Sequence, residues 1–140
     1  MIIGIDPGVN CGVAIFSGGE LKKLYTFSGI NLIEWLPYQT AAKTIVIEDS
    51  RLQSFLFSGA QQNKAQSLKI ARNVGMVDMV CHMIESLCEK SNVDLIGISP
   101  KSKGKKLQST AFNLYTGWTE KSNQHERDAA MVAWPYRGIK

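Results

Sequence analysis

The sequence predicts an α/β protein with a mixed sheet, and two features of its hydrophobic pattern lead to this expectation. Short apolar runs dominate the first third of the chain, at residues 2–5, 12–16, 21–27 and 44–47. Helical patterns then alternate with one further apolar run, at residues 93–98. Consecutive strands followed by alternating helices and strands are typical of a sheet with helices on its faces. A chain of 140 residues suits one domain, so we expect a single domain over residues 1–140.

Three strands are predicted at the start of the chain. The first, Ile2 to Ile5, ends at Asp6, and the Pro7-Gly8 pair turns the chain. Residues 12–16 and 21–27 follow as a second and a third strand, with a hairpin turn between them. We expect these three strands to form a meander. The apolar start has no basic segment and no cleavage signature, so it predicts a strand and not a signal peptide.

A short helix is predicted over residues 31–38, with its apolar side chains inward. The β-branched run that follows, Thr44 to Ile47, ends at Glu48-Asp49. Continuous apolar runs of this kind are typical of parallel strands that are covered on both faces. We therefore expect residues 44–47 and 93–98 to complete the sheet as parallel strands.

The longest helical pattern covers residues 64–90 and carries two apolar strips. The first strip steps by fours and threes along the helix: Ile70, Val74, Val77, Cys81, Ile84 and Cys88. The second consists of Met76, Met79, Val80, Met83 and Leu87. This apolar arc is wider than one core contact needs, so the second face packs either within a monomer or on a second copy. We assign a homodimer interface to the first strip, at Ile70, Val74, Val77, Cys81 and Ile84.

Two helices are predicted to close the chain. One runs from Leu107 to about Leu114. The other begins at Asn123, because Asn123 and Glu126 have the spacing of a capping box.

The charge distribution favours an anionic partner. The chain carries a formal net charge of +4, with twelve basic and seven acidic residues in 64–140 against four and five in 1–63. Four of the basic residues fall in one short segment, at Lys101, Lys103, Lys105 and Lys106. Such a segment indicates nucleic-acid binding, although a solvated loop has the same composition.

The cysteine count and the hydropathy bear on location. Three cysteines without a CxxC or Cys/His cluster predict free thiols in a reducing compartment. We therefore expect a cytoplasmic protein. No apolar stretch is long enough to cross a membrane.

Acidic residues stand at the ends of predicted elements. Asp6 and Glu48 each end a strand, and His125 and Asp128 share one face of the last helix. If the first and fourth strands are neighbours, these side chains converge. Converging carboxylates repel one another unless cations neutralise them, and such a site suits two Mg²⁺ or Mn²⁺ ions that clamp a phosphodiester. Each residue alone also has an ordinary structural role in a turn or a cap, and we assign Asp49 and His82 to such roles.

At these residues the chain resembles the RuvC Holliday junction resolvases of the RNase H-like superfamily. The resemblance lies in residues 4–14 (GIDPGVNCGVA), in Ile47-Glu48, in residues 67–75 and in the closing motif His125-x-x-Asp128-Ala. It implies an RNase H-like fold and a homodimeric, Mg²⁺-dependent endonuclease that nicks four-way DNA junctions symmetrically. By this match Asp6, Glu48, His125 and Asp128 are the metal ligands and catalytic residues.

The resemblance also implies DNA contacts. Lys101 and Lys106-Leu107-Gln108 resemble lysine positions of the family, so Lys106 is expected in catalysis and Lys101, Lys103 and Lys105 on phosphates. The family has an aromatic residue close behind the glutamate, where this chain has Arg51, with Phe55 and Phe57 later. We expect Arg51, Phe55 and Lys64 to contact DNA as well.

The sequence therefore predicts a metal-dependent, structure-selective DNA endonuclease of a bacterial or phage-infected cell. Broader cutting of flaps or forks is the nearest alternative. A monomeric RNase H and a non-catalytic junction-binding protein remain as further alternatives. An actin-like ATPase or sugar kinase needs two domains, and no P-loop motif occurs, so no nucleotide cofactor is expected.

Overall fold

A five-stranded mixed sheet forms the centre of the protein, in a computed structural model that describes residues 1–53, 63–102 and 104–140. The strands are β1 (Ile2–Asp6), β2 (Asn10–Ser17), β3 (Glu20–Ser28), β4 (Thr44–Glu48) and β5 (Asp94–Ile98), in the spatial order β3-β2-β1-β4-β5. β1, β2 and β3 pair antiparallel as a meander, whereas β4 lies parallel to both β1 and β5. The predicted mixed sheet is confirmed.

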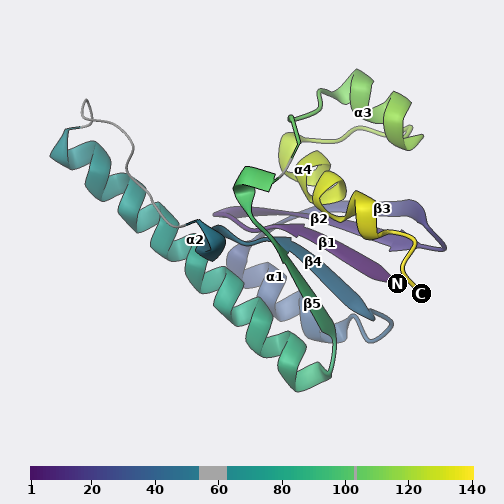
Figure 1. Cartoon of the computed structure of the whole chain (residues 1–140), viewed down its shortest axis with the longest axis horizontal. Helices are drawn as coiled ribbons and strands as arrows, with labels where there is room; N and C mark the ends of the chain where they lie inside the picture. Colours follow the sequence, from purple (N-terminus) through teal and green to yellow (C-terminus); the bar gives the residue numbers. More distant parts are fainter. Residues whose placement is uncertain (54–62, 103) are drawn as a thin grey trace.

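The helices are α1 (Gly29–Trp35), α2 (Lys64–Ser91), α3 (Ser109–Thr116) and α4 (Gln124–Ala133). α1 and α2 cover one face of the sheet, and α4 covers the other with α3 beyond it (Figure 1). The order of strands and helices is the predicted one. α1 ends earlier than predicted because Pro37 has no N–H to donate, and residues Leu36–Tyr38 form a 3₁₀ turn instead. None of the described helices is long and apolar enough to cross a membrane.

Two cores lie on opposite faces of the sheet, because successive side chains of a strand point to opposite faces. Ile3, Ile5, Val13 and Ile47 point towards α1 and α2. Ile2, Ala14, Phe16 and Val46 point towards α4. The sheet is therefore covered on both sides, as its apolar strands predict.

The face of α2 that packs on the sheet differs from the prediction. Cys81 and Ile84, assigned to a dimer interface, are fully buried in the core of this chain together with Cys88. That part of the assignment is wrong, because the first strip turns towards the chain's own sheet at this end of the helix. Ile70, Val74 and Val77 are half-buried. The exposed apolar side chains of α2 are Leu68, Met76, Met79 and Met83.

Candidate active site

Two carboxylates lie side by side at one edge of the sheet. β1 and β4 are parallel neighbours, and Ile5 pairs with Ile47, so Asp6 and Glu48 end the two strands at the same level. Both residues are half-buried, and the Asp6 side chain is 15% exposed. The first and fourth strands are neighbours, which was the condition for the two acids to lie at one edge.

The helix α4 reaches this edge because it packs closely on β1 and β2. A Cβ on Gly12 would lie 1.8 Å from the carbonyl oxygen of His125, and a Cβ on Gly4 would lie 2.4 Å from that of Ala129. Only residues without a side chain can occupy these two strand positions. The close packing places Nδ1 of His125 3.7 Å from Oδ2 of Asp6. Strand β1 and helix α4 thus contribute to one site.

The N-terminus of α4 is held by the predicted capping box. Asn123 accepts a hydrogen bond from the backbone N–H of Glu126, and the Glu126 side chain accepts one from the N–H of Asn123. Thr26 of β3 joins both: its hydroxyl accepts from Asn123 Nδ2 at 2.7 Å and donates to Glu126 Oε1 at 3.1 Å. The start of α4 is therefore tied to the sheet directly before His125.

Asp128 is the most enclosed carboxylate of the site. Its side chain is 7% exposed, its Oδ1 accepts a hydrogen bond of 2.7 Å from Gln124 Nε2, and its Oδ2 lies 3.5 Å from Lys106 Nζ. A buried carboxylate needs such partners, because loss of hydration is otherwise costly. Lys106 itself is 60% exposed, so its ammonium lies between Asp128 and solvent.

The donor set of this edge fits a hard divalent cation. Asp6, Glu48 and Asp128 supply carboxylate oxygens and His125 supplies an imidazole nitrogen, which are ligands that Mg²⁺ and Mn²⁺ accept. Among the described side chains, no group of three or more His, Cys, Asp or Glu is arranged to hold a metal ion. Two of the carboxylates instead face nitrogen atoms of the protein, those of His125 and Lys106.

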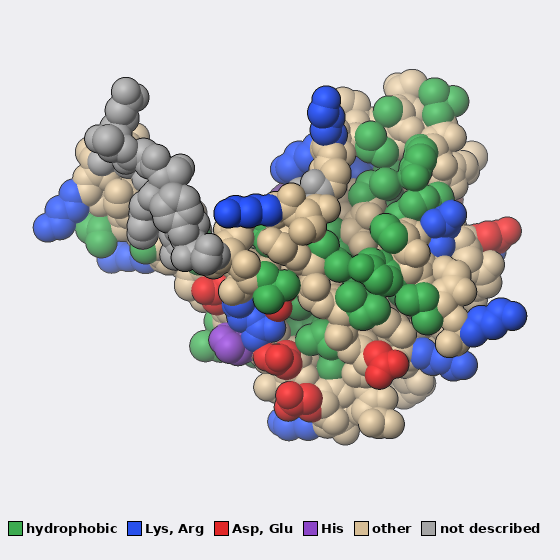
Figure 2. Space-filling model, in the orientation of Figure 1, with side chains coloured by type: hydrophobic (Ala, Val, Ile, Leu, Met, Phe, Trp, Pro, Cys, Tyr) green, Lys and Arg blue, Asp and Glu red, His purple; other side chains and the backbone are tan. Residues whose placement is uncertain are grey.

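The lysine-rich segment lies beside the carboxylates, between β5 and α3. Lys101, Lys105 and Lys106 are exposed, and Lys103 lies outside the described residues. Figure 2 shows Lys and Arg side chains around the path of this segment. A polyanion that approaches the carboxylate edge would therefore meet positive charge.

Arg51 is held by two ion pairs within the protein. It forms salt bridges of 2.7 Å with Asp49 and with Glu85 of α2, and its side chain is 19% exposed. Its Nη1 also lies 3.0 Å from His82 Nδ1. Hydrogen bonds from Arg51 hold the pKa of the Asp49 carboxyl below its usual range. The guanidinium thus links the end of β4 to α2, and the expected contact of Arg51 with DNA stays a prediction.

The other expected DNA contacts have different outcomes. Phe55 lies outside the described residues. Lys64 is exposed at the first residue of α2, a helix that extends beyond the sheet at this end (Figure 1).

Sequence reasoning missed two residues next to Asp128. Gln124 lies one helical turn before Asp128 and donates to it, and Arg127 is 7% exposed beside Gln124. The i, i+4 spacing of Gln124 and Asp128 was a signal for the first contact. Nothing in the sequence marked Arg127 as buried, because arginine is usually exposed.

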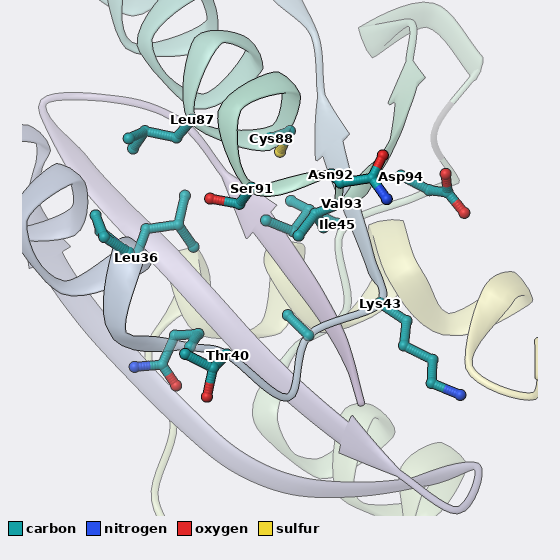
Figure 3. A pocket seen from close by; sticks show the side chains of 13 residues that line it. Leu36, Thr40, Lys43, Ile45, Leu87, Cys88, Ser91, Asn92, Val93 and Asp94 are labelled. Atoms are coloured by element: carbon teal, nitrogen blue, oxygen red, sulfur yellow. The ribbon is translucent and has the colours of Figure 1, made fainter.

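A cavity of about 540 Å³ lies at the opposite edge of the sheet, where β4 and β5 begin. Leu36, Leu87, Cys88 and Val93 line it together with Lys43 and Asp94 (Figure 3). Burial raises the pKa of the Cys88 thiol to about 11, so this sulfur is a poor nucleophile at neutral pH. The converging carboxylates at the other edge are therefore the better candidate for chemistry.

Comparison with solved structures identifies the fold. The structure of T. thermophilus RuvC in complex with a Holliday junction substrate aligns with a TM-score of 0.61 at 14% sequence identity. The alignment covers 95% of this chain and 89% of that chain. No protein-family model matches the chain, and no curated protein matches it. The chain thus has the RuvC-like form of the RNase H-like fold, as its motifs predict.

Proposed function

We propose that the protein is a divalent-cation-dependent endonuclease that resolves four-way DNA junctions by paired symmetric nicks. The observation that carries this proposal is that Asp6 and Glu48 end neighbouring strands and that His125 of α4 lies 3.7 Å from Asp6. Asp128 follows one turn later on α4, where it lies 3.5 Å from Lys106 of the lysine-rich segment. The fold supports it, because the RuvC structure with the same fold is bound to a Holliday junction substrate.

In this proposal Asp6, Glu48, His125 and Asp128 hold two Mg²⁺ or Mn²⁺ ions. When bound, such ions activate a water and stabilise the leaving oxygen of a phosphodiester. Asp6 ends β1 beside Glu48 of the neighbouring strand and lies 3.7 Å from His125 of α4, so it would be one of the residues that hold the ions. His125 and Asp128 project from one face of α4. The hydrogen bonds of Thr26 with Asn123 and Glu126 hold the start of this helix in place.

The lysine-rich segment binds the DNA backbone in this proposal. Lys101 and Lys105 contact phosphates, and these contacts orient the duplex without reading its bases. Lys106 lies 3.5 Å from Asp128 and is 60% exposed, so its ammonium can turn to the scissile phosphate and offset developing negative charge. Lys64 extends the basic surface along α2.

Paired nicks require two active sites, and the exposed methionines of α2 supply a surface for a second copy. Met76, Met79 and Met83 are 50%, 57% and 38% exposed, and Leu68 is 53% exposed. These residues replace the buried Cys81 and Ile84 as the proposed interface. The half-buried Ile70, Val74 and Val77 share the other side of the helix with Cys81 and Ile84, and their part in a dimer interface stays a separate prediction. Exposed apolar side chains along one helix are typical of such an interface.

A cleavage assay on defined substrates tests the proposal. The protein is incubated with Mg²⁺ or Mn²⁺ and an end-labelled immobile four-way junction, a flap, a fork, a linear duplex and an RNA–DNA hybrid. We expect paired nicks at symmetric positions of the junction and little cutting of the duplex and hybrid. Preferential cutting of the hybrid by a monomer would contradict the proposal and indicate a ribonuclease H.

Two other outcomes separate the remaining alternatives. Equal rates on flaps, forks and junctions would replace junction resolution with a broader branch nuclease activity. Tight junction binding without cleavage of any substrate would indicate a binding protein that retains the fold.

A further inference from the structure

A buried arginine lies behind the candidate active site. Arg127 of α4 is 7% exposed, and its guanidinium donates four hydrogen bonds to three residues. Nε donates to the carbonyl of Leu107 at 2.9 Å, and Nη1 donates to the carbonyl and hydroxyl of Ser122 at 2.7 and 3.2 Å. Nη2 donates to Oε1 of Gln124 at 3.2 Å. A buried charge with this many acceptors holds all of them in one arrangement.

One branch of this network ends on Asp128. Because Arg127 donates to the amide oxygen of Gln124, the amide nitrogen of Gln124 is turned the other way, and it donates to Asp128 Oδ1 at 2.7 Å. The guanidinium and the carboxylate thus favour the same orientation of the Gln124 amide. Without Arg127, the amide oxygen would lose its donor, and the carboxylate alone would hold the amide.

The second branch ends on the other oxygen of the same carboxylate. Leu107, whose carbonyl accepts from Arg127, directly follows Lys106, whose ammonium lies 3.5 Å from Asp128 Oδ2. The lysine-rich segment is therefore tied to α4 next to the lysine that faces Asp128. In the first branch Arg127 acts on Asp128 Oδ1 through the Gln124 amide. In the second branch it acts on Oδ2 through the backbone of Leu107, which follows Lys106.

We infer that Arg127 is a positioning residue that orients Asp128 through Gln124 and Lys106. This inference rests on the proposed function, in which Asp128 is a cation ligand. Groups that orient a ligating side chain typically change cation affinity or activity by about 10- to 100-fold when they are removed. Arg127 therefore couples the lysine-rich segment, the proposed DNA-binding segment, to Asp128, the proposed cation ligand.

The variants Arg127→Met, Arg127→Lys and Gln124→Leu test the inference, with Arg137→Met as the matched control. Arg137 also donates a guanidinium hydrogen bond to a backbone carbonyl, that of Trp134, and stacks on the Trp134 ring, away from the site. Each variant is assayed for junction cleavage at saturating DNA over a range of Mg²⁺ concentrations, and for junction affinity without Mg²⁺. Hydrogen exchange of the Gln124 side-chain amide is followed by NMR in the wild-type protein and in the arginine variants.

We expect Arg127→Met to lower kcat by about 10- to 100-fold and to raise the Mg²⁺ concentration needed for half-maximal activity, with little change in junction affinity. Arg127→Lys should recover part of the loss, because lysine can donate to some of the same acceptors. The Gln124 amide should lose its protection from exchange in Arg127→Met and keep it in Arg137→Met.

A loss of activity in Arg127→Met no larger than that in Arg137→Met, or a Gln124 amide that exchanges as in the wild type, would overturn the inference. If Arg127→Met does not fold, Gln124→Leu decides, and unchanged cleavage by this variant would overturn it. If the wild-type protein cuts no branched DNA, the proposed function fails. The amide exchange then still tests the role of Arg127 by itself.

Discussion

Nδ1 of His125 lies 3.7 Å from Oδ2 of Asp6, which joins the last helix of the chain to its first strand. This contact depends on Gly12, because any side chain there would meet the backbone of His125. Asp128 lies one turn after His125 on the same helix. The candidate site is thus a consequence of how closely α4 approaches the sheet.

We expect Gly12→Ala to displace α4 and to lower the free energy of unfolding by about 1–3 kcal/mol or more, because its Cβ would lie 1.8 Å from the carbonyl oxygen of His125. Urea denaturation measures this change. Gly75→Ala is the control: nothing lies within 4 Å of a Cβ there, and alanine should stabilise the helix by about 0.5–1 kcal/mol. A Gly12→Ala protein as stable as the wild type would show that α4 does not need this approach.

Asp49 should contribute to stability in a pH-dependent way. Hydrogen bonds from Arg51 lower the pKa of Asp49 in the folded protein. The stabilisation by Asp49 is therefore fully present above the pKa of Asp in the unfolded chain, which is about 3.9. It is lost as the pH falls through the lower, folded value. Denaturation at a series of pH values should show that Asp49→Asn loses less stability than the wild type between neutral and acidic pH. Equal slopes for Asp49→Asn and the wild type would contradict the role of this ion pair.

Replacing Lys101, Lys105 and Lys106 with glutamine should weaken binding of junction DNA and reduce its dependence on salt. Each phosphate contact contributes about 0.9 to the slope of log K against log salt concentration, so each lost contact lowers the slope by about that amount. Binding titrations at several salt concentrations measure the slope. Lys43→Gln, at the opposite edge of the sheet, should leave it unchanged. A triple variant with the wild-type slope would remove the segment from the DNA interface.

Met79→Glu should convert the proposed dimer to a monomer, because it places a charge among the exposed apolar side chains of α2. Sedimentation or light scattering over a range of concentrations measures the mass. Ile30→Glu is the control, since Ile30 is 71% exposed on α1 and belongs to no proposed interface. A persistent dimer in Met79→Glu would place the interface elsewhere.

The strands and helices were predictable because each carries a local signal. The apolar runs, the Pro7-Gly8 turn and the capping box of Asn123 specify the elements in order, and the position of Asp6 and Glu48 follows from strand ends. The neighbourhood of β1 and β4 was left open by the sequence and is established by the order of the strands in the sheet. The small side chains of Ala129, Ala130 and Ala133 allow α4 to pack closely on the sheet.

The rest depends on tertiary contacts that have no local pattern. Both apolar strips of α2 have helical spacing, and only the packing shows that Cys81 and Ile84 face the chain's own sheet. Arg51 was assigned to DNA by its position after Glu48, whereas its partner Glu85 lies far away in the sequence. Arg127 likewise finds its acceptors in loops before α4.

Comparison of binding and cleavage by Asp6→Asn tests the central claim most directly. Binding of the four-way junction is measured without Mg²⁺, and cleavage of the same junction is measured with Mg²⁺ or Mn²⁺, for the variant and the wild type. The account predicts that the wild type nicks the junction in symmetric pairs, and that Asp6→Asn remains folded and binds the junction but does not cut it. Cleavage by the folded Asp6→Asn protein at the wild-type rate would contradict the assignment of the chemistry to this edge of the sheet.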